Sequence, residues 1–183
     1  MSLSTDDLKK VLAKSELIYS ADQVAQAIDK IALQLNERLQ EAQPLLLCVM
    51  NGGLVFTGQL MLRLTCFPQV DYIHATRYRN QTSGTTLDWR AYPSHDLKNR
   101  TVLIVDDILD EGVTLKAIVE YCREQGAKQV LTAVLVQKKH DRCVDGIESD
   151  YVGLEVEDKY VFGFGMDYHA QLRHLNGIYA LHE

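Results

Sequence analysis

The sequence predicts an α/β fold, in which a mostly parallel, twisted sheet carries helices on both faces. Short apolar runs alternate along the chain with longer segments whose apolar residues recur every three or four positions. The short runs are apolar at successive positions, which is typical of parallel strands buried on both faces. Strands that alternate with helices favour a parallel sheet covered from both sides.

Polar residues mark the starts of two helices in the first half of the chain. Ser4 and Ser20 each begin a segment that resembles a capping box. The second of these helices is amphipathic and stops before Pro44. The expected elements of this half are helix 5–13, a helix from about 20 to 42, strand 45–49, turn 51–53, helix 54–64 and strand 70–76.

The second half opens with a polar stretch, residues 77–99, that contains Gly84 and Pro93. Long connections of this kind are usually functional, so we expect a mobile loop or lid. A short turn or helix is expected near residues 168–173. The other expected elements are strand 101–106, helix 114–125 closed by Gly126, and strands 129–136, 151–156 and 178–181.

Length and composition fit one globular domain without repeats or linkers. The chain has 183 residues, of which 46% are hydrophobic and 24% are charged. Its net charge of −6 argues against non-specific binding to nucleic acid or to an anionic membrane. An anionic small substrate is compatible with this charge, because local N–H groups and Mg²⁺ can outweigh the field of the whole molecule.

The sequence also indicates the compartment. No apolar run approaches the ~20 residues of a membrane helix, and no basic region followed by an apolar core begins the chain. The four cysteines show no CxxC and no zinc spacing, so we expect free thiols that are mostly buried. We therefore expect a cytoplasmic protein that does not bind membranes.

The most informative segment runs from Val102 to Thr114. Four apolar residues indicate a buried strand that leads directly into Asp106 and Asp107, and residues 110–114 then lead into a helix. A strand followed by a glycine-containing turn and a helix is typical of a phosphate site, because backbone N–H groups point at the anion. The two carboxylates suit a sugar diol or a hydrated Mg²⁺. The strand and acidic pair alone also occur in other doubly wound folds.

With Asp110, Gly112 and Thr114 at these spacings, the segment resembles the phosphoribosyl-pyrophosphate loop of the type I phosphoribosyltransferases. Motifs in the C-terminal part resemble the hypoxanthine(-guanine) branch of that family, and the likeness covers residues from about 16 to the end. The resemblance implies one phosphoribosyltransferase domain over 1–183. Its parts would be a core over about 16–150, a hood over about 151–183 and a mobile loop over about 77–99.

The resemblance also implies the reaction. A Mg²⁺-dependent enzyme of purine salvage would transfer the 5-phosphoribosyl group from phosphoribosyl pyrophosphate to N9 of hypoxanthine or guanine. The products would be IMP or GMP and pyrophosphate. Relatives are dimers or tetramers, so a homodimer or homotetramer is expected.

Roles for the residues of the loop follow from the resemblance. Asp110 matches the family's general base, near purine N7; its plain alternative is to cap the helix that follows. Asp106 and Asp107 would accept hydrogen bonds from the ribose hydroxyls, directly or through Mg²⁺-bound water. The residues that would hold the 5′-phosphate are Glu111, Gly112, Val113 and Thr114.

Residues 50–53 resemble the family's pyrophosphate loop, in which a non-proline cis peptide is usual. Asn51 stands where many relatives have lysine, so its contact and that of Gly52 would come from the backbone. An ordinary strand-to-helix turn is the alternative. Arg77 likewise stands where relatives usually have serine, so the details of pyrophosphate contact stay open.

A lysine after the strand 129–136 would donate to purine O6 and so favour oxopurines. The end of the strand points to Lys138, whereas counting back from Gly153 points to Lys139; we expect Lys138. Two solvated lysines in a basic loop are the alternative. The six histidines form no recognisable ligand pattern.

The C-terminal motifs complete the expected site. Tyr160 would stack on the purine, and backbone groups of Val161 would read its edge. Asp167 matches a carboxylate that binds Mg²⁺, together with the acidic pair of the loop, and Arg173 matches an arginine for pyrophosphate. These residues would otherwise be an ordinary core aromatic and a surface ion pair.

Two other functions stay open on the sequence alone. One is transfer to a different base, such as xanthine or adenine. The other is a non-catalytic regulator that senses phosphoribosyl pyrophosphate and binds RNA or DNA, but such a protein would need a basic face and this chain is acidic.

Overall fold

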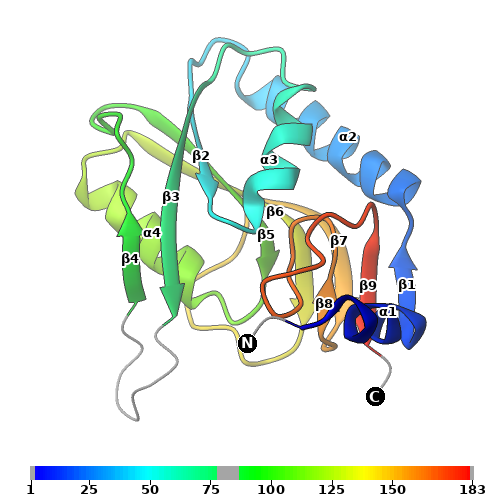
Figure 1. The fold of residues 1–183 in the computed structure, drawn as a ribbon. Coiled ribbons are helices and arrows are strands. Elements are labelled where there is room, and N and C mark those ends of the chain that lie inside the picture. The colour runs from blue at the N-terminus through cyan, green and yellow to red at the C-terminus, as the bar shows by residue number, and fades with distance from the viewer. Residues whose placement is uncertain (1–2, 78–86, 182–183) are drawn as a thin grey trace.

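The computed structural model describes residues 3–77 and 87–181, and it confirms the expected α/β architecture (Figure 1). A six-stranded sheet has the strand order β4-β3-β2-β5-β6-β7, and every neighbouring pair except β3–β4 is parallel. The strands of this sheet are β2 (Leu45–Val49), β3 (Gln69–Arg77), β4 (Leu87–Ala91), β5 (Thr101–Leu109), β6 (Gln129–Lys139) and β7 (Tyr151–Glu157).

Helices cover both faces of this sheet. On one face, α2 (Ala21–Arg38) and α3 (Gly53–Met61) share a buried cluster with Leu46 and Leu103. On the other face, α4 (Val113–Glu124) packs with Leu47 and Ile104. Since successive residues of a strand point to opposite faces, each position of the central strands meets a core, which is why these runs are apolar throughout.

A smaller antiparallel sheet joins the two ends of the chain. Its order is β1-β9-β8, formed by β1 (Ser15–Tyr19), β9 (Ile178–Leu181) and β8 (Val161–Phe162), and α1 (Thr5–Ala13) precedes β1. The sequence did not predict β1 or β8. None of the residues of β1 is fully buried, and β8 has only two residues, so neither produces a strong apolar pattern.

Helix starts are confirmed more closely than helix ends. Ser4 caps α1, and Ser20 forms the expected capping box with Gln23 at the start of α2. However, α2 ends at Arg38 and α3 at Met61, three or more residues earlier than expected. Backbone turns follow both helices: the N–H groups of Ala42, Arg63 and Leu64 each bond to a carbonyl three positions back.

The expected loop over 77–99 is wrong in part. Residues Leu87–Ala91 form β4, which pairs antiparallel with β3 at the edge of the sheet. The sequence did not predict this strand, because none of its residues is fully buried and its apolar pattern is therefore weak. Residues 78–86 of the expected loop lie outside the described residues.

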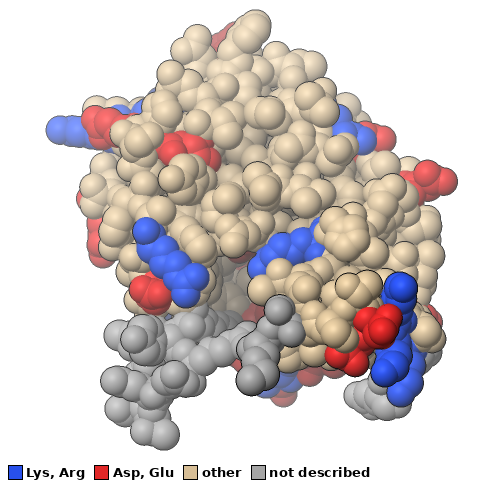
Figure 2. Space-filling model, viewed as in Figure 1, with Lys and Arg blue, Asp and Glu red and all other residues tan. Residues whose placement is uncertain are grey.

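The face over α3 and β3 carries few charged side chains (Figure 2). Several large apolar side chains are exposed there, among them Met61, Val70 and Tyr72. The four cysteines are free, and three of them are buried, as expected. Within the described residues, no helix combines the length and apolar character that a membrane crossing needs.

Candidate active site

The residues expected to form the site gather where three parallel strands end. β5 lies between β2 and β6 in the sheet, and both pairings are parallel. Asn51 and Gly52 follow β2, residues 106–114 end β5 and lead into α4, and Lys138 lies at the end of β6. Ligands of open α/β sheets bind outside the carboxyl ends of the strands, which is where these segments meet.

Asp106 and Asp107 belong to β5 itself, which corrects the expected end of that strand at residue 106. The last register pair with β2 is Cys48 and Val105, whereas pairing with β6 continues to Leu109. The acidic pair therefore lies just beyond the end of β2. β6 is longer than expected for the same reason, since β7 keeps pairing with it up to Lys139.

The loop that follows β2 packs directly on this acidic pair. The Met50–Asn51 peptide bond is cis, as is usual in the loop that this segment resembles. A Cβ atom at Gly52 would overlap the Asp107 carboxylate, and one at Gly53 would lie 2.7 Å from the Val105 carbonyl oxygen. The two glycines therefore allow the loop to touch β5.

Asp106 is buried, and the neighbouring Asp107 is half-buried. Asp106 is 8% exposed, and its Oδ1 accepts a hydrogen bond from the Asp107 N–H at 2.9 Å. Burial, followed by the charge of Asp107, raises the pKa of Asp106 well above its usual value. Burial also raises the pKa of Asp107, although Asp106 and the charge of Arg173 act in the opposite direction.

The turn after β5 has the geometry expected of an anion site. Gly112 adopts a left-handed conformation with φ of 78° and precedes α4, and no side chain caps the start of this helix. The first N–H groups of any helix have no partner within it, so those of Val113 and Thr114 can serve an anion. The alternative role of Asp110 as a helix cap is wrong, because its carboxylate binds elsewhere.

Two side chains from the end of β6 hold the Asp110 carboxylate. Lys138 Nζ donates to Oδ2 at 3.0 Å, and His140 Nε2 lies 2.7 Å from Oδ1. Burial opposes ionisation of Asp110, but the hydrogen bonds from Lys138 and His140 outweigh it and hold the pKa of Asp110 below its usual value. Asp110 is therefore ionised at neutral pH.

The structure separates the two candidate lysines. The Lys138 side chain is 13% exposed and faces Asp110, while that of Lys139 is 53% exposed and pairs with Glu155 at 2.7 Å. Since β6 continues to Lys139, neighbouring side chains alternate in direction, and Lys138 and Lys139 cannot face the same site.

Three residues at this edge were missed by the sequence interpretation: His140, Arg142 and Asp158. Arg142 makes a two-pronged ion pair with Asp158, with distances of 2.6 and 2.8 Å, and this bond lowers the pKa of Asp158. Asp158 also lies 3.9 Å from Lys138. Nothing in the sequence joins these residues, because they become neighbours only through the pairing of β6 with β7.

The C-terminal segment that was expected to form a hood holds a partly exposed aromatic ring. Tyr160 is 49% exposed, its hydroxyl donates to the Asp167 carbonyl oxygen at 3.1 Å, and its ring meets the edge of Tyr168. Val161 is buried and pairs with Ala180 in the small sheet. The ring of Tyr160 is therefore half open to solvent, while Val161 offers backbone groups.

Asp167 and Arg173 form an ion pair within the C-terminal segment. Arg173 Nη2 lies 2.9 Å from Asp167 Oδ1, and the Ala170 N–H donates to Asp167 Oδ2 at 2.7 Å. A Cβ atom at Gly165 would overlap the carbonyl oxygen of Gly52, so the C-terminal segment touches the loop after β2. The C-terminal motifs and residues 50–53 thus meet, as the expected site requires.

The expected metal ligands are only partly brought together. Asp106, which is buried, and Asp107, which is half-buried, offer adjacent carboxylates, the oxygen donors that Mg²⁺ prefers, and a divalent cation would relieve their mutual repulsion. The acidic pair therefore fits Mg²⁺. Asp167 does not join the pair to make a group of three; among the described residues, the group of three side chains close enough to hold an ion together is Asp110, His140 and Asp158.

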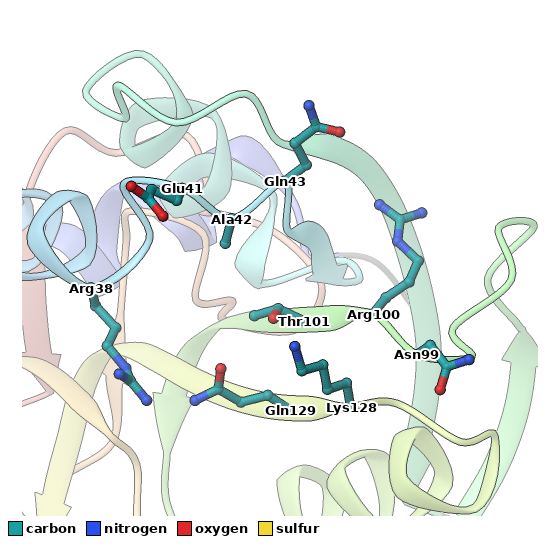
Figure 3. Close-up of a pocket in the computed structure, with 9 residues that line it drawn as sticks. All are labelled: Arg38, Glu41, Ala42, Gln43, Asn99, Arg100, Thr101, Lys128 and Gln129. Atoms are coloured by element: carbon teal, nitrogen blue, oxygen red, sulfur yellow. The ribbon is translucent and has the colours of Figure 1, made fainter.

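A separate hollow of about 460 Å³ lies at the opposite end of the sheet (Figure 3). Its cationic residues are Arg38 at the end of α2 and Arg100 and Lys128 just before β5 and β6. Because strands begin here, this hollow faces the amino ends of β5 and β6. It therefore lies away from the carboxyl edge that gathers the expected site residues.

Comparison with known proteins gives one family match. Residues 15–170 match the phosphoribosyl transferase domain. The hypoxanthine-guanine phosphoribosyltransferase of Streptococcus pneumoniae is 30% identical over 179 residues, which cover 97% of this chain and 96% of that protein. The hypoxanthine-guanine-xanthine phosphoribosyltransferase of Tritrichomonas foetus is also 30% identical, over 97% of this chain and 94% of that protein.

Solved structures show the same fold. A hypoxanthine phosphoribosyltransferase from Staphylococcus aureus superposes with a TM-score of 0.88 at 24% sequence identity, and the match covers 99% of this chain and 97% of that one. The described elements therefore form an architecture that is known from crystal structures.

Proposed function

Since this chain belongs to the phosphoribosyl transferase domain family, we propose that it is a purine salvage enzyme. Over a single domain, residues 1–183, it transfers the 5-phosphoribosyl group from phosphoribosyl pyrophosphate to N9 of hypoxanthine or guanine. The relatives' names support this substrate class. A cytoplasmic location stays a prediction.

The observation that carries the proposal is the meeting of Asp110 with Lys138 beside the glycine turn of β5 and α4. An ionised carboxylate can accept a proton, and a half-buried ammonium can donate to a carbonyl oxygen. A 6-oxopurine needs both, because it must lose a proton and present O6. An aminopurine offers no acceptor at that position.

The ribose phosphate binds along the turn after β5. The N–H groups of residues 111–114 and the Thr114 hydroxyl hold the 5′-phosphate. Asp106 and Asp107 accept hydrogen bonds from the ribose hydroxyls. Backbone groups of Asn51 and Gly52, together with Arg173, bind the pyrophosphate.

In the reaction, the bond from C1′ to the pyrophosphate oxygen breaks, and its electrons leave with pyrophosphate. The N9–C1′ bond forms from the purine lone pair, and Asp110 takes the proton from N7. Lys138 orients the base through O6 while Tyr160 stacks on its ring and Val161 reads its edge. Asp106 and Asp107 would hold Mg²⁺, which would supply positive charge to the leaving pyrophosphate; Asp167, the third expected ligand, is paired with Arg173 in this structure.

Transfer to xanthine is a second candidate. The Tritrichomonas foetus relative, whose name includes xanthine, is as similar to this chain as the Streptococcus pneumoniae one. Hypoxanthine, guanine and xanthine share O6 and differ at position 2, which in this family is read mainly by backbone groups. Lys138 therefore supports all three bases equally.

An ultraviolet assay of nucleotide formation tests the proposal. The protein is supplied with Mg²⁺, phosphoribosyl pyrophosphate and, in separate reactions, hypoxanthine, guanine, xanthine or adenine. Turnover of hypoxanthine or guanine well above adenine is the expected result. If no base turns over and the protein still binds phosphoribosyl pyrophosphate, the enzyme proposal is wrong and the regulator gains support.

A further inference from the structure

His140 is a buried histidine in an otherwise polar segment. It follows β6 directly, within the sequence Lys-Lys-His-Asp-Arg, yet its side chain is only 4% exposed. The side chains of Lys138, at the end of the strand, and His140, in the bend that follows it, both reach the same group. That group is the Asp110 carboxylate.

The hydrogen bonds of the ring fix its protonation. The backbone N–H of Arg142 approaches His140 Nδ1 at 3.1 Å, and a backbone N–H can only donate. Nδ1 is therefore the acceptor and carries no proton. The ring proton sits on Nε2 and is donated to Asp110 Oδ1, 2.7 Å away.

Both carboxylate oxygens of Asp110 therefore accept a hydrogen bond. His140 holds Oδ1, and Lys138 holds Oδ2 at 3.0 Å. Each carboxylate oxygen has two lone pairs, so one remains available on each after these bonds. The charged and titratable groups around this carboxylate are Lys138, His140, Arg142, Cys143, Glu111 and Asp158.

The loop that carries His140 is itself anchored. The Arg142 side chain makes a two-pronged ion pair with Asp158, which lies between β7 and β8. The N–H of Val144 donates to the carbonyl oxygen of Glu111 at 2.9 Å, which ties the loop to the turn after β5. The histidine ring is thus held against Asp110 from two directions.

We propose that His140 is a positioning residue for the base of the transfer reaction: a neutral imidazole that fixes the orientation of the Asp110 carboxylate. It is not a second base, because Nε2 already bears a proton and Nδ1 is occupied by the Arg142 N–H. This inference rests on the proposed function, in which Asp110 accepts the purine proton.

Kinetics of three variants test the role. His140→Ala removes the donor, His140→Gln keeps an N–H group at a similar distance, and Asp141→Asn is the matched control in the same loop. We expect kcat to fall about 10- to 100-fold in His140→Ala with little change in the KM for phosphoribosyl pyrophosphate. His140→Gln should regain most of the loss, and Asp141→Asn should match the wild type.

The pH profile separates positioning from mere structural support. Loss of the His140 hydrogen bond disfavours the ionised form of Asp110, so the acid limb of kcat/KM should move to higher pH in His140→Ala alone. Wild-type kcat in His140→Ala, or equal losses in the Ala and Gln variants without a shift of the acid limb, would overturn the proposal. Thermal melting checks that each variant folds.

A spectroscopic measurement keeps this inference distinct from the proposed function. In long-range ¹H–¹⁵N spectra of the whole protein at neutral pH, we expect His140 to be neutral with its proton on Nε2. A proton on Nδ1 would overturn the positioning role even in an active enzyme. If the wild type transfers to no base, the proposed function fails, whereas the state of the ring is still measured.

Discussion

Lys138 and Lys139 are neighbours whose side chains leave β6 in opposite directions, and only Lys138 meets Asp110. From the sequence we expected Lys138, because the end of the strand points to it, while counting back from Gly153 kept Lys139 as an alternative. What decides between them is the extent of β6, which continues through polar residues that give no apolar signal. Sequence reasoning thus identified the chemistry here but not the direction of the side chain.

These two lysines make a matched pair for mutation. Lys138→Met should lower kcat/KM for hypoxanthine by about 10²-fold, because an acceptor on the base loses its donor and Asp110 loses a partner. Lys139→Met should stay near the wild type, because only an exposed ion pair is broken. Steady-state kinetics of both variants check this, and equal losses would contradict the assignment of O6 to Lys138.

The buried carboxyl group of Asp106 predicts a stability that depends on pH. The pKa of Asp106 is raised in the folded protein, so the folded state holds its proton more tightly than the unfolded chain does. The free energy of unfolding should therefore fall as pH rises from the ordinary aspartate pKa, about 4, toward the raised value. Asp106→Asn should weaken this fall and raise the melting temperature of the ligand-free protein at neutral pH.

Melting curves of the wild type and Asp106→Asn between pH 4 and 8 measure this effect. The amide still offers an oxygen to the Asp107 N–H, so the packing of the pair is kept. A variant that is less stable than the wild type at neutral pH would show that the acidic pair is not repulsive.

At the scale of elements, Gly112 joins β5 to α4 in a conformation that few residues adopt. Its φ is 78°, and a Cβ atom there would lie 2.6 Å from the Ile147 side chain. Gly146 offers a control with φ of 77° and nothing within 4 Å. Gly146→Ala should lower the free energy of unfolding by about 1–2 kcal/mol, because alanine is strained in this left-handed conformation and meets no neighbouring atom.

Gly112→Ala should destabilise more than Gly146→Ala, because overlap with Ile147 is added to the backbone cost. Chemical denaturation of the two variants measures the difference in the free energy of unfolding. If both variants lose the same free energy of unfolding, the turn adjusts to the added methyl group and does not need glycine for its packing.

Central and edge elements differ in how well the sequence predicted them. The central strand β2 has apolar residues at every position, and β5 and β6 each contain a long apolar run; the caps at Ser4 and Ser20 have specific partners, so these elements were found. β1 and β4 contain no fully buried residue, and their pairing partners lie far along the chain or at the sheet edge. The apolar pattern of the local sequence therefore does not predict these two strands.

At the scale of the whole molecule, the candidate site depends on contacts that only the fold creates. Asp110 and Tyr160 have recognisable local motifs, and the sequence singled them out. His140 and Arg142 have none, since their significance comes from bonds to Asp110 and Asp158 across the edge of the sheet. Residues of this second kind can be found only once strand order and register are known.

The face over α3 and β3 supports the prediction of a homodimer or homotetramer. Met61, Val70 and Tyr72 expose apolar surface there, and few charged residues surround them (Figure 2). Apolar patches of this kind typically mark protein interfaces. Light scattering coupled to gel filtration should show an oligomer for the wild type.

Met61→Glu should shift the protein toward monomer, because a charge is then placed in the apolar face. Leu33→Glu, at an exposed position of α2, is the control and should leave the assembly unchanged. A wild-type monomer, or an oligomer that is unaffected by Met61→Glu, would contradict this assignment of the interface.

The most direct test of the account is the turnover of hypoxanthine by the wild type and by Asp110→Asn, measured beside the binding of phosphoribosyl pyrophosphate. We expect the wild type to form IMP, and the variant to bind phosphoribosyl pyrophosphate but to turn over about 10²- to 10⁴-fold more slowly, as loss of a general base predicts. An Asp110→Asn variant as fast as the wild type would show that the chemistry does not depend on this carboxylate.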